Sequence, residues 1–329
     1  MIASVAFRNF KALRRTSLAL GPFNLVIGPN GSGKTSLIEA LLRLHALAQL
    51  PPLPATAPTQ RSGGPVIEFH FAPPHDAIGV RLGCESELLC DFLQVQPPGA
   101  VGWPALSADL ARIRGYVLNH EAIARPSDQG GGTELQSDGG NLAAVLAAMR
   151  AAHADVFAAL TAEVQRILPE FVGIELTEAG AGKVALGLRL SDGALVADES
   201  VSQGTLYLLA VLALTFDPAP PAVLCIEEID RGIHPRILRE VRDALYRLSH
   251  PSSFGLARKP VQIVATTHSP YLLDLFRDHP EEVVIMQKHG TAAHFERLTD
   301  RADFAELLRE GSLGDMWFSG ILGGVPEEP

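Results

Sequence analysis

The sequence predicts an α/β protein in which a mostly parallel sheet is flanked by helices. Short apolar runs of strand length occur at residues 23–27, 222–226 and 262–267, and helix-forming segments follow them along the chain. Such runs suit strands buried on both faces, and their alternation with helices is typical of parallel sheets. With 47% apolar and 19% charged residues, the chain has the composition to bury a core of this kind.

Prolines and glycines divide the first half of the chain. They crowd residues 51–65, which predicts a loop, and they recur between 73 and 141, where we expect irregular structure with a single helix. The expected elements of this half are strands at 2–7, 17–20, 23–27 and 66–71 and helices at 34–47 and 107–113.

The second half is more regular. Asn141 can cap the first of its helices, and Pro169 stops the second. The expected elements are helices at 142–152, 154–168, 202–216, 235–248 and 270–276 and strands at 171–176, 183–190, 222–226, 262–267 and 282–286. We expect a single domain over residues 1–329 with two lobes. Residues 1–72 and about 217–329 form one lobe, and about 73–216 form an irregular, helical one.

The charge balance limits the modes of nucleic-acid binding. The chain of 329 residues has 27 Lys and Arg against 37 Asp and Glu, a formal net charge of −10. This argues against a protein that coats nucleic acid or anionic membranes through bulk charge. A local basic groove remains compatible with it.

Cysteine usage and hydropathy indicate the compartment. Cys84, Cys90 and Cys225 form no CxxC pair and have no nearby His at metal-ligand spacing, so we expect neither a zinc site nor a disulfide. The N-terminus carries basic residues where a signal peptide needs an apolar core. The longest apolar stretch, residues 206–216, is well short of the ~20 residues that span a bilayer. We therefore expect a cytoplasmic protein without membrane insertion.

A glycine-rich motif follows the strand at 23–27. Residues 28–35, GPNGSGKT, match GxxxxGK[ST] between an apolar strand and a helix start, a context that a chance match would lack. The glycines let backbone N–H groups surround phosphate oxygens, Lys34 can reach the β and γ phosphates, and the Thr35 hydroxyl can bind Mg²⁺. The motif predicts a nucleotide site with the candidate binding residues Asn30, Gly31, Gly33, Lys34, Thr35 and Ser36.

Charged and titratable side chains follow two later strands. Glu227 and Glu228 end the strand at 222–226, and we expect Glu227 to hold the metal through water and Glu228 to polarise an attacking water. His268 follows the strand at 262–267, where it can hydrogen-bond the γ phosphate. The alternatives are a solvated acidic turn and a structural histidine. Because three strand ends meet at one edge of a parallel sheet, we favour a shared catalytic site.

These motifs together resemble the ABC-type ATPases of the RecF/SMC and OLD-like group, in its compact branch of predicted AAA-family ATPases without coiled coil or TOPRIM domain. The resemblance rests on residues 8–11 (RNFK), 28–35, 135–142 (LQSDGGNL), 202–205 (SQGT), 227–228, 233–235 (IHP), 267–270 (THSP) and 317–320 (WFSG). It implies an ABC-type P-loop fold with a smaller antiparallel part and a helical lobe that carries the signature motif.

The resemblance also implies further site residues. In ABC-type ATPases two subunits enclose two ATP molecules, which assigns Ser202 and Gly204 to the γ phosphate held by the other copy. A lone Ser202 would otherwise be an ordinary helix cap. The family's Q-loop assigns Gln60 to the metal, and its N-terminal motif assigns Lys11, or Arg8, to the nucleotide phosphates. The alternative for this basic motif is a solvated turn.

The resemblance implies an ATPase that uses ATP and Mg²⁺ and forms an ATP-dependent homodimer. Relatives act in DNA repair or anti-phage defence, often with a nuclease as a separate effector chain, and DNA is a further expected ligand. The subunit of an ABC transporter is the alternative, although the signature Ser-Gln-Gly-Thr differs from the transporter form. A small-molecule kinase is disfavoured by the ABC-type setting of Glu228 and His268.

Overall fold

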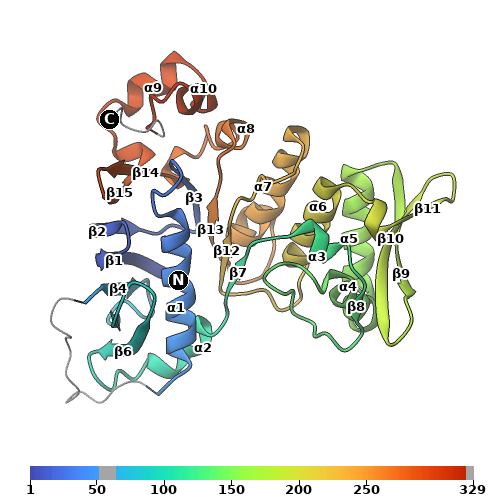
Figure 1. Ribbon diagram of the computed structural model, residues 1–329, viewed down its shortest axis with the longest axis horizontal. Coiled ribbons are helices and arrows are strands. Elements are labelled where there is room, and N and C mark those ends of the chain that lie inside the picture. The colour runs from blue at the N-terminus through green and yellow to red at the C-terminus, as the bar shows by residue number, and fades with distance from the viewer. Residues whose placement is uncertain (52–63, 324–329) are drawn as a thin grey trace. The chain divides into compact units, whose positions relative to one another are not determined.

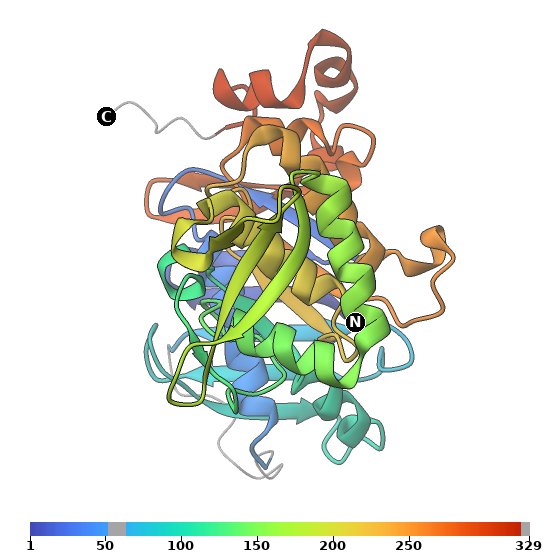
Figure 2. The ribbon, with the colours of Figure 1, turned by 90° about the vertical axis from the view of Figure 1, so that its right-hand side faces the viewer.

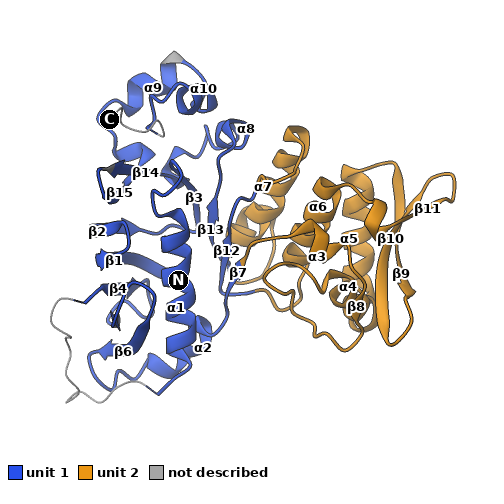
Figure 3. Cartoon of the chain, viewed as in Figure 1, with its two compact units in different colours: residues 1–115, 221–229, 260–329 blue, residues 116–220, 230–259 orange. Residues whose placement is uncertain are grey.

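The computed structural model describes residues 1–51 and 64–323 and divides into two compact units (Figure 3). The first unit comprises Met1–Gly115, Pro221–Ile229 and Pro260–Pro329, and the second comprises Tyr116–Pro220 and Asp230–Lys259. Relative to the expected lobes, residues 73–115 join the first unit and residues 230–259 the second. That a single domain covers the whole chain stays a prediction.

The first unit contains a sheet with the strand order β15-β14-β3-β13-β12-β7 (Figure 1). β14, β3, β13 and β12 run parallel, and β15 pairs antiparallel with β14 at the edge. The bounds are β3 Phe23–Ile27, β7 Ile113–Tyr116, β12 Val223–Ile226, β13 Gln262–Thr266, β14 Val283–His289 and β15 Ala292–Arg297. Every residue of β3, β12 and β13 is buried, as their apolar sequences predict. The predicted α/β class is confirmed.

A second sheet of the same unit is antiparallel, in the order β2-β1-β4-β5-β6. Its strands are β1 Ile2–Phe10, β2 Leu13–Ala19, β4 Val66–Phe71, β5 Gly79–Cys84 and β6 Cys90–Gln96. Helix α1 (Lys34–Ala48) contributes Leu41 to a hydrophobic core that also holds Val26 of β3 and Phe69 of β4. One core therefore joins both sheets, which confirms the expected antiparallel part.

The segment predicted to be irregular contains regular elements. β5 and β6 extend the antiparallel sheet beyond β4, and α2 covers Trp103–Leu110. The predicted helix at 107–113 is wrong at both ends. Pro104 fits the first turn of a helix, so α2 begins earlier, and the buried Ile113 begins strand β7.

Cys84 and Cys90 form a disulfide, which contradicts the expectation of no disulfide. The antiparallel register of β5 and β6 places these two residues opposite each other. Their spacing in sequence matches no familiar motif, so the pairing follows from a register that the sequence pattern did not reveal. Cys225 is a free, buried cysteine.

Three short helices complete the first unit. They are α8 Pro270–Asp274, α9 Phe304–Glu310 and α10 Leu313–Phe318, and α10 packs on α8. The Ser269 side chain caps α8 by accepting the N–H of Leu272 at 3.2 Å. The polypeptide that follows β13 therefore turns directly into a helix.

The second unit is mainly helical. Its helices are α3 His120–Ile123, α4 Leu142–Ala152, α5 Ala154–Ile167, α6 Gln203–Thr215 and α7 Pro235–Ser249. Its strands are β8 Ser127–Asp128, β9 Phe171–Glu178, β10 Lys183–Leu190 and β11 Leu195–Ala197, all antiparallel. Helices α4 and α5 pack on β10 and β9 (Figure 2), and α7 packs on α6. This is the expected helical part.

Helix α6 is buried on all sides. Every residue from Thr205 to Thr215 is buried, so the helix has no polar face. The apolar stretch at 206–216 thus lies almost entirely within this buried helix, and the helix expected at 202–216 is confirmed. Short 3-10 turns cover Asp198–Ser200, Pro251–Phe254, Pro280–Glu282 and Leu298–Asp300. Within the described ranges, no helix has the length and apolar character needed to cross a membrane.

Candidate functional site

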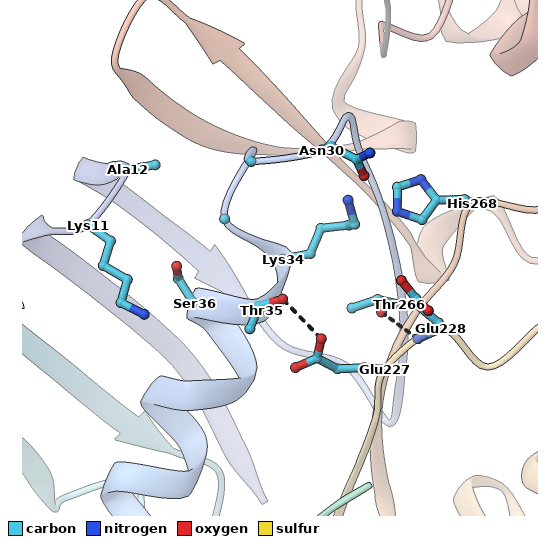
Figure 4. Close-up of a pocket in the computed structure, with 12 residues that line it drawn as sticks. Lys11, Ala12, Asn30, Lys34, Thr35, Ser36, Glu227, Glu228, Thr266 and His268 are labelled. Carbon is cyan, nitrogen blue, oxygen red and sulfur yellow. Dashed lines mark hydrogen bonds between the residues drawn. The ribbon is translucent and has the colours of Figure 1, made fainter. Parts of the chain in front are cut away.

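A pocket lies in the first unit where the glycine-rich loop meets the ends of β12 and β13 (Figure 4). Its volume of ≈ 360 Å³ falls within the usual range for small-molecule sites. The lining residues are Lys11, Ala12, Asn30, Gly31, Gly33, Lys34, Thr35, Ser36, Glu227, Glu228, Thr266 and His268. Every candidate predicted from the glycine-rich motif, both glutamates and the histidine thus lie around one cavity.

The backbone of the loop is held in a shape that favours glycine. Gly31 and Gly33 have φ values of 72° and 99°, in the left-handed region. A Cβ on Gly28 would lie 2.9 Å from the carbonyl oxygen of Met286 on β14, so the loop can pass this strand only with glycine there. No side chain caps the N-terminus of α1. Its first N–H groups are therefore available to an anion.

Lys34 is positioned by the loop itself. Its Nζ donates to the carbonyl oxygens of Gly28 at 2.8 Å and Pro29 at 3.0 Å, and the residue is only 9% exposed. Burial lowers the pKa of Lys34 from 10.5 to about 8, and the negative charges of Glu228 and Glu227 oppose this shift. An ammonium in this setting gains strongly from a bound polyanion.

Thr35 and Glu227 form an oxygen-rich pair. Thr35 Oγ1 donates to Glu227 Oε2 at 3.0 Å (Figure 4). Burial raises the pKa of Glu227, the neighbouring Glu228 raises it further, and the Thr35 hydrogen bond and Lys34 lower it. A hydroxyl and a carboxylate suit Mg²⁺, which prefers oxygen ligands and is usually bound by few protein groups plus substrate phosphates. These residues therefore fit the expected metal.

Glu228 has an unusual backbone conformation. Its φ is +49°, a left-handed value that costs a non-glycine residue on the order of 1–3 kcal/mol. Its N–H donates to Thr266 Oγ1 at 2.9 Å (Figure 4). Sequence reasoning did not select Thr266 or Ala12 as site residues. The position of Thr266 at a strand end beside His268 was the available signal for the first, and nothing marked the second.

His268 and Asn30 lie at the end of the pocket toward which the Lys34 amine points (Figure 4). His268 comes from the loop after β13 and Asn30 from the glycine-rich loop. The two polar side chains and the ammonium thus gather at the same end of the cavity. Figure 4 places both carboxylates, Glu227 and Glu228, below Lys34 in this view.

Lys11 reaches the pocket from the turn between β1 and β2. Asn9 and Lys11 both have positive φ values, 54° and 53°, and the Lys11 amine forms an ion pair with Glu39 of α1. The other basic candidate, Arg8, instead lies 3.9 Å from Glu68 and is not among the lining residues. Of the two basic candidates for phosphate contact, the structure places Lys11 at the cavity.

The remaining candidates lie elsewhere. Ser202 and Gly204 belong to the second unit, where Ser202 Oγ caps α6 by accepting the N–H of Thr205 at 3.2 Å. A Cβ on Gly204 would lie 2.7 Å from the carbonyl oxygen of Gly232. Gln60 lies outside the described residues. Across the described part of the chain, no cluster of three or more His, Cys, Asp or Glu side chains is suited to a metal.

Comparisons with known proteins identify the family of the chain. A family model described as "AAA domain, putative AbiEii toxin, Type IV TA system" matches residues 103–274, and one described as "AAA ATPase domain" matches residues 1–52. No curated protein matches the chain.

Solved structures of SMC heads have a similar fold. An SMC head bound to the C-winged helix domain of ScpA has a TM-score of 0.59 at 13% identity, over 90% of this chain and 96% of that one. An Smc head with an extended coiled coil, bound to the C-terminal domain of ScpA derived from Pyrococcus furiosus, has a TM-score of 0.58 at 14% identity. The match covers 94% of this chain and 99% of that one. The SMC head domain from Thermotoga maritima has a TM-score of 0.50 at 14% identity, over 90% of this chain and 98% of that one. At these identities the likeness establishes the fold.

Proposed function

Because the chain belongs to the AAA-domain family whose model spans residues 103–274, we propose that it is a dimerising switch that binds ATP and hydrolyses it to ADP and phosphate. The observation that carries this proposal is the composition of the pocket. Lys34 and Thr35 of the glycine-rich loop line it together with Glu227, the hydrogen-bond partner of Thr35, and with Glu228 and His268. Phosphoryl transfer needs a charge-neutralising cradle and an oriented water, and these residues supply both.

The nucleotide phosphates would bind at the start of α1. The uncapped N–H groups after Gly33 and the Lys34 ammonium would bind the β and γ phosphates. Thr35 and Glu227 would hold Mg²⁺, which when bound neutralises phosphate charge. Lys11, freed from Glu39, would add a further positive charge at the same cavity.

Hydrolysis would use the two residues at the strand ends. The Glu228 carboxylate would orient a water and accept its proton as the oxygen attacks the γ phosphorus. The bond from that phosphorus to the bridging oxygen breaks, and ADP and phosphate leave. His268 would donate a hydrogen bond to the γ phosphate as negative charge redistributes.

A second copy of the chain would complete the site. Ser202 offers a hydroxyl at the N-terminus of α6, and Gly204, which has no side chain, lies in the first turn of that helix. We assign both to the γ phosphate bound by the partner copy. ATP binding would then join two heads, and hydrolysis would separate them.

The biological setting is proposed by analogy. We assign the switch to DNA repair or anti-phage defence in the cytoplasm, together with a separate effector such as a nuclease. Two of the similar SMC heads are described as bound to a domain of ScpA, which supports the idea of a protein partner. With a net charge of −10, any DNA contact would be a local groove, weakened by modest salt.

The test separates ATP binding from hydrolysis. Glu228→Gln keeps the shape of the side chain and removes the base, so it should bind ATP and accumulate as an ATP-bound dimer. Lys34→Ala should lose ATP binding and stay monomeric. Light scattering with and without Mg-ATP measures the oligomeric state of both variants. Glu178→Gln, at an exposed position on β9, is the matched control and should behave as the wild type. Equal dimerisation of the Glu228 and Lys34 variants would refute the shared-site mechanism.

A further inference from the structure

The end of the β12–β13 pairing determines where Glu228 can go. The parallel register runs from Val223 opposite Gln262 to Ile226 opposite Ala265, and the ladder stops there. Beyond this point the chain after β12 no longer follows the sheet, so its N–H groups need other acceptors. The next residue of β13, Thr266, provides them.

Thr266 holds the backbone on both sides of the Glu228 peptide unit. Its Oγ1 accepts the N–H of Glu228 at 2.9 Å, and its carbonyl oxygen accepts the N–H of Ile229 at 3.0 Å. Two successive N–H groups are thus bound by one residue. Together these bonds fix the turn in which Glu228 adopts its left-handed φ of +49°.

The Thr266 side chain is suited to this task. The residue is only 2% exposed, so it is almost entirely shielded from solvent. Its β-branched side chain is also restricted in χ1. It therefore presents the oxygen in a nearly fixed position. Thr266 also lines the nucleotide pocket together with Glu228, so this support lies at the pocket itself.

We propose that Thr266 is a positioning residue for ATP hydrolysis, holding the Glu228 backbone so that its carboxylate faces the pocket. This inference rests on the proposed function, because it acts through Glu228. Without the Oγ1 acceptor, the strained φ of Glu228 is no longer compensated, and the segment relaxes toward negative φ. The carboxylate then loses its alignment with the attacking water.

The test compares two substitutions of similar size. Thr266→Val removes the acceptor with little change of shape, whereas Thr266→Ser retains it. We expect Thr266→Val to lower kcat by about 10- to 100-fold with an unchanged Kd for ATP, since alignment rather than binding is lost. Thr266→Ser should restore most of the turnover. Thr215→Val, which removes a buried hydroxyl bonded to Leu212 within α6, is the matched control and should keep the wild-type kcat.

A double-substitution cycle asks whether the effect passes through Glu228. In a Glu228→Gln background, Thr266→Val should cause almost no further loss of kcat, because the two residues act as a unit. A full additional loss, or a Thr266→Val variant with wild-type kcat, would overturn the inference while leaving the ATPase itself intact.

A separate readout applies if the wild-type protein proves not to hydrolyse ATP, an outcome that refutes the proposed function. Hydrogen exchange at the Glu228 amide then tests whether the Thr266 hydroxyl holds the Glu228 backbone. We expect this amide to be protected in the wild type and in Thr266→Ser, and to exchange faster in Thr266→Val. Equal protection in all three proteins would overturn the inference.

Discussion

The buried ammonium of Lys34 makes ATP affinity depend on pH above neutrality. Burial lowers the pKa of this residue to about 8 in the nucleotide-free protein, while phosphate binding requires the charged form. Binding ATP at higher pH must therefore be accompanied by uptake of a proton. Affinity should fall as the pH rises through the pKa of the free protein.

The size of the effect follows from this pKa. With a value of about 8, roughly nine-tenths of the Lys34 side chains are charged at pH 7 and roughly one-tenth at pH 9. The Kd for ATP should therefore increase about tenfold between pH 7 and 9, which is about 1.4 kcal/mol. The negative charge of Glu228 raises the pKa of Lys34. Removing that carboxylate should therefore lower the pKa of Lys34, so that the affinity for ATP begins to fall at lower pH.

Calorimetric titration with Mg-ATP at constant ionic strength measures this dependence. Lys34→Arg is the matched control, because guanidinium stays charged across the whole range. Its affinity is expected to be weaker, since a larger planar guanidinium replaces the ammonium that donates to the Gly28 and Pro29 carbonyls, yet independent of pH. A wild-type Kd that is constant from pH 7 to 9, or that follows the Lys34→Arg variant, would refute the reasoning.

Three further predictions concern other parts of the chain. His268→Ala should reduce turnover by about 100-fold, measured by phosphate release, with nucleotide affinity little changed, whereas a matching loss of affinity would contradict its proposed role. Gly204→Ala should lower the free energy of unfolding by about 1–3 kcal/mol in urea titrations, because its Cβ would meet the Gly232 carbonyl; an unchanged midpoint would speak against this contact. Cys225 is buried with a pKa raised to about 12, so an aromatic disulfide reagent should detect no thiol in the native protein and one after denaturation without reductant; three thiols would exclude the disulfide.

The part of the site that sequence reasoning located is built from local signals. The glycine-rich loop lies between one strand and the helix that follows, so its residues from Asn30 to Ser36 could be assigned from their immediate neighbours. Glu227, Glu228 and His268 each end an apolar strand, and parallel strands bring such ends to one edge. Local pattern and sheet topology were therefore sufficient to gather them.

The parts that were not predicted depend on register between strands. The disulfide requires that β5 and β6 pair so that Cys84 lies opposite Cys90, and no local pattern specifies that alignment. The contact between Thr266 and Glu228 likewise depends on where the β12–β13 ladder ends. Proline-rich flanks hid the short strands of residues 79–96, because breakers at the ends of a strand resemble those of a loop.

Helix α6 has a consequence for sequence variation in this protein. All positions from Thr205 to Thr215 are buried, so the helix offers no solvent-facing stripe on which substitutions could accumulate. In an ordinary surface helix, positions that tolerate substitution recur with a period of 3.6 residues. Along α6 we expect no such periodicity. The helix that carries Ser202 at its N-terminus therefore has no side that tolerates free substitution. Only exchanges that conserve side-chain volume and polarity should be neutral along it.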